Sequence, residues 1–168
     1  MTDWLGLACL IVAIGLLYRL SVIDLRVRLL PDRYVLSFAI SGFLFHIFTG
    51  FAYGNTLGMA AGAALGAGIL YGIRLVANHI YKQDALGLGD VKLMGAAGIW
   101  LSDWVLMALC VGSLCGMVHG LAAGLIESRR TGQKLDLNRL EVPAGPGFAL
   151  GIVVIGGYIF REFFQGLF

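Results

Sequence analysis

Six apolar stretches, separated by short polar segments, fill most of this 168-residue chain. A transmembrane helix takes about 20 residues, so six would use about 120 and leave fewer than about 50 for all loops and tails together. The chain is therefore predicted to be all-α, a polytopic membrane protein whose six-helix bundle forms a single membrane-embedded domain over residues 1–168. The stretches are Trp4 to Tyr18, Tyr34 to Phe51, Thr56 to Ala77, Val91 to Leu101, Trp104 to Ile126 and Phe148 to Phe160.

The composition agrees with a protein that lives in lipid. Apolar residues make up 59% of the chain and charged residues 13%, far from the averages of soluble proteins. Glycine occurs 25 times and recurs at every fourth position in three places, a spacing that lets neighbouring membrane helices approach closely. The three sets are Gly58, Gly62 and Gly66; Gly112, Gly116, Gly120 and Gly124; and Gly147 and Gly151.

The basic residues predict an orientation. Eleven of the twelve lie in or beside alternate loops, and only Arg161 lies on the other side. The positive-inside rule then places the N-terminus outside, the loops after the first, third and fifth helices in the cytoplasm, and the C-terminus outside. The first stretch is expected to be a retained helix, because Arg19 follows it where a signal peptide would need a small-residue cleavage site.

The fourth stretch is too short to cross a bilayer. Its eleven residues make about 16 Å of helix, roughly half of the hydrocarbon thickness. Either the helix starts earlier, near Leu86, or the segment from Leu86 to Asp90 enters the membrane as non-helical backbone. Such backbone survives only where protein buries it or a water-filled cavity solvates it. Asp90 is therefore expected at a wet site walled by protein.

Two aspartates lie at the predicted cytoplasmic ends of apolar stretches. A structural role is open to each, with Asp24 paired to Arg26 or Arg28 and Asp90 as a helix N-cap. Ionisable residues at membrane depth are also candidates for function. If the bundle brings the two together, they can share one proton. One carboxylate would take a proton from an attacking water while the other stabilises the oxyanion, and the sequence does not assign the two roles. This chemistry needs no metal and no organic cofactor.

Other polar residues near these aspartates have simpler interpretations. Lys92 lies two positions after Asp90, about 200° around a helix, and is expected to face away toward the interface. Asp32 is expected to be a solvated loop residue. The segment from Pro143 to Gly147 is predicted to be a rigid turn, with Pro146 near the start of the last helix.

Three motifs in order resemble those of the bacterial type IV prepilin peptidases. They are Asp24 with Leu30-Pro31-Asp32, then Gly87-Leu88-Gly89-Asp90-Val91-Lys92-Leu93, then Pro143-Ala144-Gly145-Pro146. That family consists of GxGD-type membrane aspartic proteases, related in mechanism to archaeal preflagellin peptidases and to presenilin. The resemblance runs from about Ser21 to Gly151, which is most of the chain.

The resemblance implies an enzyme and a substrate class. It implies that Asp24 and Asp90 are catalytic in an endopeptidase of the bacterial inner membrane. The substrates would be prepilin-like proteins in the same bilayer, which have a short basic leader and are cut at the cytoplasmic face after a glycine that precedes the hydrophobic helix. Type IV pilins, type II secretion pseudopilins and Flp/Tad-type pilins are the candidates, and no nucleic acid partner is implied. The motif residues expected to shape the site are Gly87, Gly89, Lys92, Pro143, Gly145 and Pro146.

The chain departs from longer members of the resembled family in two ways. Those members carry a cytoplasmic insertion with paired Cys-x-x-Cys motifs and also methylate the new pilin N-terminus. This chain has three cysteines and no such pair, so methyltransferase activity is not expected. Many relatives also have a glutamate shortly before the GxGD segment, where Asp84 is the nearest acid here.

Two other functions compete with the protease. A small ion-coupled or proton-coupled transporter or channel subunit would also suit a glycine-rich bundle with an interrupted helix. The protease is favoured because the sequence shows no convincing internal repeat and its conspicuous acids lie toward one face. An assembly scaffold with purely interfacial aspartates is the third possibility.

Overall fold

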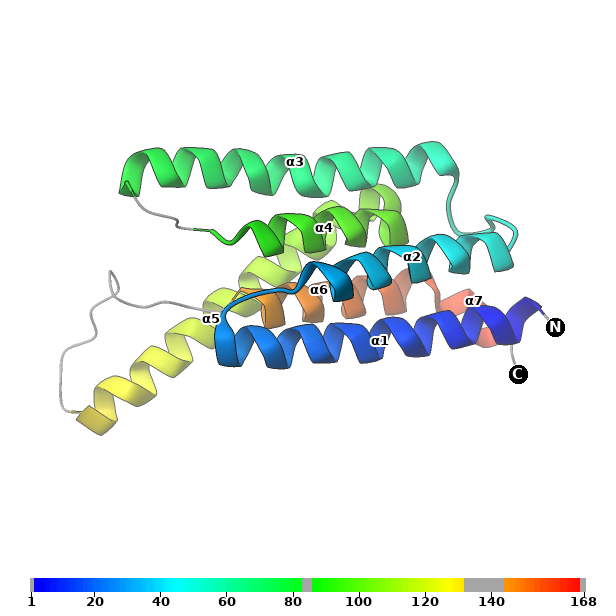
Figure 1. Cartoon of the computed structure of the whole chain (residues 1–168). Coiled ribbons are helices and arrows are strands. Elements are labelled where there is room, and N and C mark those ends of the chain that lie inside the picture. Colours follow the sequence, from blue (N-terminus) through cyan, green and yellow to red (C-terminus); the bar gives the residue numbers. More distant parts are fainter. Residues whose placement is uncertain (1, 83–85, 132–143, 167–168) are drawn as a thin grey trace.

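The computed structural model describes residues 2–82, 86–131 and 144–166, with the backbone alone for Thr2, Asp3, Glu127 and Thr131. The described parts are helical and contain no strand, which confirms the predicted all-α class. The elements are α1 (Thr2–Val27), α2 (Asp32–Phe48), α3 (Thr56–Tyr81), α4 (Leu88–Leu101), the 3-10 turn η1 (Ser102–Trp104), α5 (Val105–Thr131), α6 (Gly145–Ile159) and α7 (Arg161–Gly166) (Figure 1).

Three stretches of the described chain are long and apolar enough to cross a membrane. They are Trp4–Val27, Thr56–Tyr81 and Leu88–Arg130, the last of which joins α4, η1 and α5. Apolar side chains such as Ile11, Val12 and Ile14 of α1 are exposed, which would be unfavourable in water and is ordinary against lipid. The protein is therefore a multi-pass membrane protein. The count of six spans and the orientation remain predictions.

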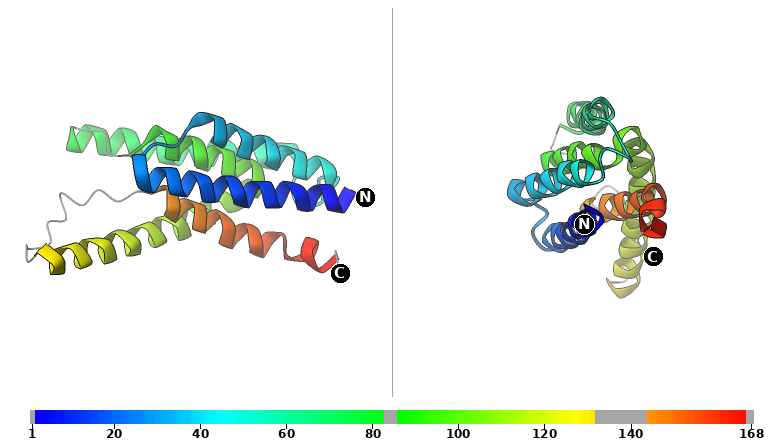
Figure 2. Two further views of the ribbon diagram at one scale, coloured as in Figure 1. Left: turned by 60° about the horizontal axis from the view of Figure 1, so that its bottom comes forward. Right: turned by 90° about the vertical axis from the view of Figure 1, so that its right-hand side faces the viewer.

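Glycines bring the helices of the bundle into close contact. α3 lies along α4, α1 along α2 and α5 along α6, while the C-terminal part of α5 extends away from the bundle (Figures 1 and 2). A Cβ at Gly62 of α3 would collide with the carbonyl oxygen of Ser102. A Cβ at Gly147 of α6 would lie 2.6 Å from the carbonyl oxygen of Gly112 in α5. The close packing predicted from the glycine spacing is confirmed at these positions.

The short fourth stretch takes the first of its two predicted forms. α4 begins at Leu88 with Gly87 as its N-cap and has 14 residues, so it is longer than the eleven-residue apolar stretch. Asp90 is the third residue of α4 and not its N-cap, so the structural role considered for it above is wrong. The helix ends at Leu101, where Ser102 has a positive φ of 51° with ψ of −134° and the chain turns through η1 into α5.

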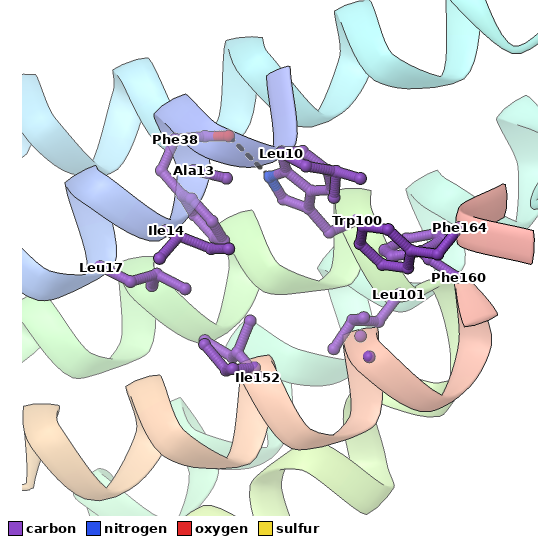
Figure 3. A pocket seen from close by; sticks show the side chains of 13 residues that line it. Leu10, Ala13, Ile14, Leu17, Phe38, Trp100, Leu101, Ile152, Phe160 and Phe164 are labelled. Carbon is purple, nitrogen blue, oxygen red and sulfur yellow. Dashed lines mark hydrogen bonds between the residues drawn. The ribbon is translucent and has the colours of Figure 1, made fainter. Parts of the chain in front are cut away.

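Aromatic side chains fill the end of the bundle near the two termini. Trp100 Nε1 donates a hydrogen bond of 2.8 Å to the carbonyl oxygen of Phe38, and the rings of Phe45 and Phe160 lie 4.8 Å apart. Beside them, residues of α1, α2, α4, α6 and α7 line a pocket of about 120 Å³ (Figure 3). Its lining, which includes Leu17 and Ile152, contains no ionisable residue, so acid–base chemistry belongs to another part of the molecule.

Candidate active site

Asp24 and Asp90 meet at the opposite end of the bundle. Asp24 lies in the last turn of α1 and Asp90 in the first turn of α4, and these two helix ends lie on the same side of the molecule (Figure 1). Both side chains are buried, with 6% and 8% of their surfaces exposed. Both line one cavity of about 220 Å³, and their carboxyl groups are close enough to interact electrostatically. The fold therefore joins the two acids that the sequence separates by more than sixty residues.

The start of α6 holds Asp24 in place. The backbone N–H of Gly145, the first residue of α6, donates a 2.9 Å hydrogen bond to Asp24 Oδ2. A helix N-terminus carries unpaired N–H groups and a partial positive charge, so it suits a carboxyl group. A Cβ at Gly145 would lie 2.7 Å from Asp24 Oδ2, so only glycine allows this approach. Pro146 follows as the second residue of α6, near the helix start as predicted, but residues 145–147 already belong to α6 and are not part of a turn as expected.

The two glycines before Asp90 serve different contacts. A Cβ at Gly87 would lie 3.1 Å from Asp90 Oδ2, so this glycine makes room for the carboxyl group itself. A Cβ at Gly89 would lie 2.7 Å from the Cβ of Leu30, so the second glycine admits the segment between α1 and α2. Asp90 Oδ1 is buried and has no hydrogen-bond partner among the described residues. Because buried polar atoms normally have partners, this oxygen is suited to a molecule bound in the cavity.

The segment between α1 and α2, residues 28–31, closes one side of the cavity. We call it the α1–α2 connection. Arg28 interacts electrostatically with Asp24, as the structural interpretation of Asp24 expected. Leu30 is buried, and Asp32 follows as the first residue of α2. The Asp32 carboxylate accepts hydrogen bonds of 2.7 and 2.8 Å from Lys92 Nζ.

Two predictions about this region are wrong. Lys92 lines the cavity together with Asp90, although its Cβ was expected to face away. Asp32 is exposed but belongs to α2 and to an ion pair, so it is not a loop residue. The prediction for Lys92 failed because the lysine side chain is long, so its ammonium group can reach Asp32 whatever the direction of the Cα–Cβ bond.

Most of the predicted site residues converge here. Asp24, Gly87, Gly89, Asp90 and Lys92 line the cavity, and Gly145 contacts Asp24 directly. Pro143 and Asp84 lie outside the described residues. The structure adds lining residues that sequence reasoning did not select for the site, although each lies within or beside a quoted motif. They are Arg28, Leu29, Leu30, Asp32 and Leu88.

The arrangement suits acid–base chemistry on a substrate that reaches the membrane surface. Two interacting carboxyl groups in a confined space resist double ionisation, so one can act as base and the other as acid. Arg28 and Lys92 line the same cavity, so basic and acidic residues both surround it.

Known proteins with similar sequences are named as leader peptidases. Residues 10–121 match the type IV leader peptidase family. The prepilin leader peptidase/N-methyltransferase of Escherichia coli K12 is 31% identical over 141 residues, which are 83% of this chain and 58% of that protein. The Aeromonas hydrophila protein of the same name is 34% identical over 149 residues, 88% of this chain and 48% of that one. This chain thus spans about half the length of the curated relatives it matches. No solved structure shows a significant match.

Proposed function

This chain belongs to the type IV leader peptidase family, and we propose that it is an aspartic endopeptidase that removes the leader peptide from prepilin-like membrane proteins. Asp24 and Asp90 are its catalytic pair. The observation that carries the proposal is that these two buried carboxyl groups line one cavity at one end of a membrane bundle. The relatives named above bear leader peptidase in their names, which supports the same reaction.

The reaction is a hydrolysis of a peptide bond by water. One carboxylate of the pair accepts a proton from the water as its oxygen attacks the scissile carbonyl carbon. The other, protonated, donates a hydrogen bond to the carbonyl oxygen as negative charge develops there. The C–N bond then breaks as the leaving amine takes up a proton. The roles of base and acid belong to the coupled pair and not to either residue alone.

The location of the pair suits a substrate that is itself a membrane protein. The acids lie at helix ends, where a polar leader outside the bilayer meets an apolar segment inside it. Together with the positive-inside rule, this supports cleavage at the cytoplasmic face of the bacterial inner membrane. We propose the leader-peptidase reaction and not an N-methyltransferase reaction, because two carboxyl groups suffice only for the first.

The other candidate functions receive less support. An ion-coupled transporter would be expected to carry polar groups along the bundle, whereas the pocket at the other end is lined by apolar side chains such as Leu10 and Phe164. The family match does not favour a transporter. A scaffold with interfacial aspartates is disfavoured by the burial of both acids.

Cleavage in proteoliposomes tests the proposal. The purified full chain is incubated with a prepilin-like substrate, and mass spectrometry locates the cut. We expect Asp24→Asn and Asp90→Asn each to lower the rate by about 10³-fold or more, since each removes a group required in the transition state. Asp103→Asn, which removes an exposed acid near the other end of α4, serves as the matched control. Full cleavage by either site variant would sink the proposed pair, and ion flux without cleavage would favour a transporter.

A further inference from the structure

Two contacts fasten the α1–α2 connection and Asp32, the residue that follows it, to the first turns of α4. The first is apolar, where Leu30 packs against Gly89 so closely that a Cβ there would lie 2.7 Å from the Cβ of Leu30. The second is ionic, between Asp32 and Lys92. Asp90 lies between Gly89 and Lys92 in the chain, so the two attachments flank the second acid of the pair.

The same connection starts one helical turn after the first acid. The backbone N–H of Arg28 donates a 2.9 Å hydrogen bond to the carbonyl oxygen of Asp24, which closes the last turn of α1. Arg28 then adopts a left-handed conformation with φ of 53°, and Pro31 fixes its own φ at −65°. The path from Asp24 to Asp32 is therefore short and restricted in shape. We therefore expect a movement of Asp32 relative to α4 to change the spacing between the two carboxyl groups.

Lys92 and Asp32 form the ionic attachment with good geometry. Both carboxylate oxygens of Asp32 lie within 2.8 Å of Lys92 Nζ. The side chains are 50% and 71% exposed, so the pair is expected to add little to global stability. Leu30 holds the connection to α4 at one point, and the attachment at Asp32 adds a second point on the other side of Asp90. The ion pair therefore fixes the position of Asp32 on α4 more than it stabilises the whole fold.

We propose that Asp32 and Lys92 are a positioning pair, which holds the α1–α2 connection on α4 and thereby sets the spacing of Asp24 and Asp90. This inference rests on the proposed peptidase function. Neither residue reacts. Asp32 could instead bind the basic leader of the substrate directly, and the two roles differ in kinetics, because misplacement of the acids lowers kcat whereas loss of a leader contact raises KM.

A set of charge variants in the purified full chain tests the pair. We expect Asp32→Asn and Lys92→Gln each to lower kcat by about tenfold with KM within about twofold, since small misplacements of catalytic groups have large effects on rate. The double variant should be no slower than either single variant, and the swapped pair, Asp32→Lys with Lys92→Asp, should recover most of the lost kcat. Arg33→Gln and Asp103→Asn remove comparable exposed charges that do not line the cavity and should keep the wild-type kcat.

Three results would overturn the positioning role. These are a wild-type kcat in either single variant, multiplicative losses in the double variant, or a raised KM in Asp32→Asn alone. If the wild-type chain cleaves no prepilin, the proposed function fails, and the attachment is judged without substrate. A double-mutant cycle on thermal unfolding then shows coupling between Asp32 and Lys92 if they hold the connection, and strict additivity if they do not.

Discussion

Asp24 is bonded to Gly145, a residue 121 positions further along the chain, through a 2.9 Å hydrogen bond from the first N–H of α6. This contact fixes the first acid of the proposed pair through a helix other than α4. It ties the end of α1 to the start of α6, so the cavity depends on α6 as well as on α1, α2 and α4.

The Gly145→Ala variant is expected to lose activity while it keeps its fold. The new Cβ would lie 2.7 Å from Asp24 Oδ2, so either the carboxyl group or the start of α6 must move. A displacement of about 1 Å in a catalytic group can lower kcat by about a hundredfold, so we expect kcat to fall by about ten- to a hundredfold. Gly157→Ala lies in the same helix with nothing within 4 Å of its Cβ, and is the matched control. Equal cleavage rates for the two variants would contradict the role given to Gly145.

Alanine substitutions at the two glycines before Asp90 should have different effects, one on kcat alone and the other on both kcat and the melting temperature. At Gly87 the Cβ comes closest to Asp90 Oδ2, at 3.1 Å, and its next neighbours lie at 3.9 Å or more, so Gly87→Ala should lower kcat and leave the melting temperature unchanged. At Gly89 the new Cβ would lie 2.7 Å from the Cβ of Leu30, so the α1–α2 connection must shift. Gly89→Ala should therefore lower both kcat and the melting temperature. Such overpacking costs about 1–3 kcal/mol. Cleavage assays and thermal unfolding of the same preparations provide the comparison, and a larger loss of stability in Gly87→Ala would contradict it.

Much of this architecture could be predicted from local sequence. Apolar runs and four-residue glycine spacing are properties of single helices, so the helices and the close packing at Gly62 and Gly147 follow from them. The two aspartates could also be selected, because ionisable groups are costly in apolar surroundings and therefore conspicuous.

The partners of these residues could not be predicted in the same way. The bond from Gly145 to Asp24 and the ion pair between Asp32 and Lys92 join residues far apart in the chain. They depend on how α6 approaches α1 and how α4 approaches α2, which no local pattern specifies. The direction of Lys92 was predicted wrongly because a periodicity argument fixes its Cβ and not its flexible side chain.

Alanine substitutions at two glycines of α3 should differ in their effect on stability, because only one of these glycines packs closely against the neighbouring chain. In Gly62→Ala the new Cβ would collide with the backbone of Ser102, and separating the two helices should cost about 1–3 kcal/mol. Gly68 of α3 has nothing within 4 Å of its Cβ, so Gly68→Ala should be neutral or stabilise the helix by about 0.5–1 kcal/mol. Thermal unfolding in detergent gives both values. Similar melting temperatures would show that α3 does not pack as described.

The orientation of the bundle can be tested with two single cysteines. In a chain whose three cysteines are replaced by alanine, Ala52→Cys marks the turn between α2 and α3, and Arg33→Cys marks the start of α2 near the proposed catalytic pair. Both positions are exposed. The positive-inside rule places Arg33 in the cytoplasm. A membrane-impermeant maleimide added to spheroplasts should therefore label Ala52→Cys at once, and Arg33→Cys only after permeabilisation. The reverse pattern would put Asp24 and Asp90 on the outer face, where a cytoplasmic leader could not reach them.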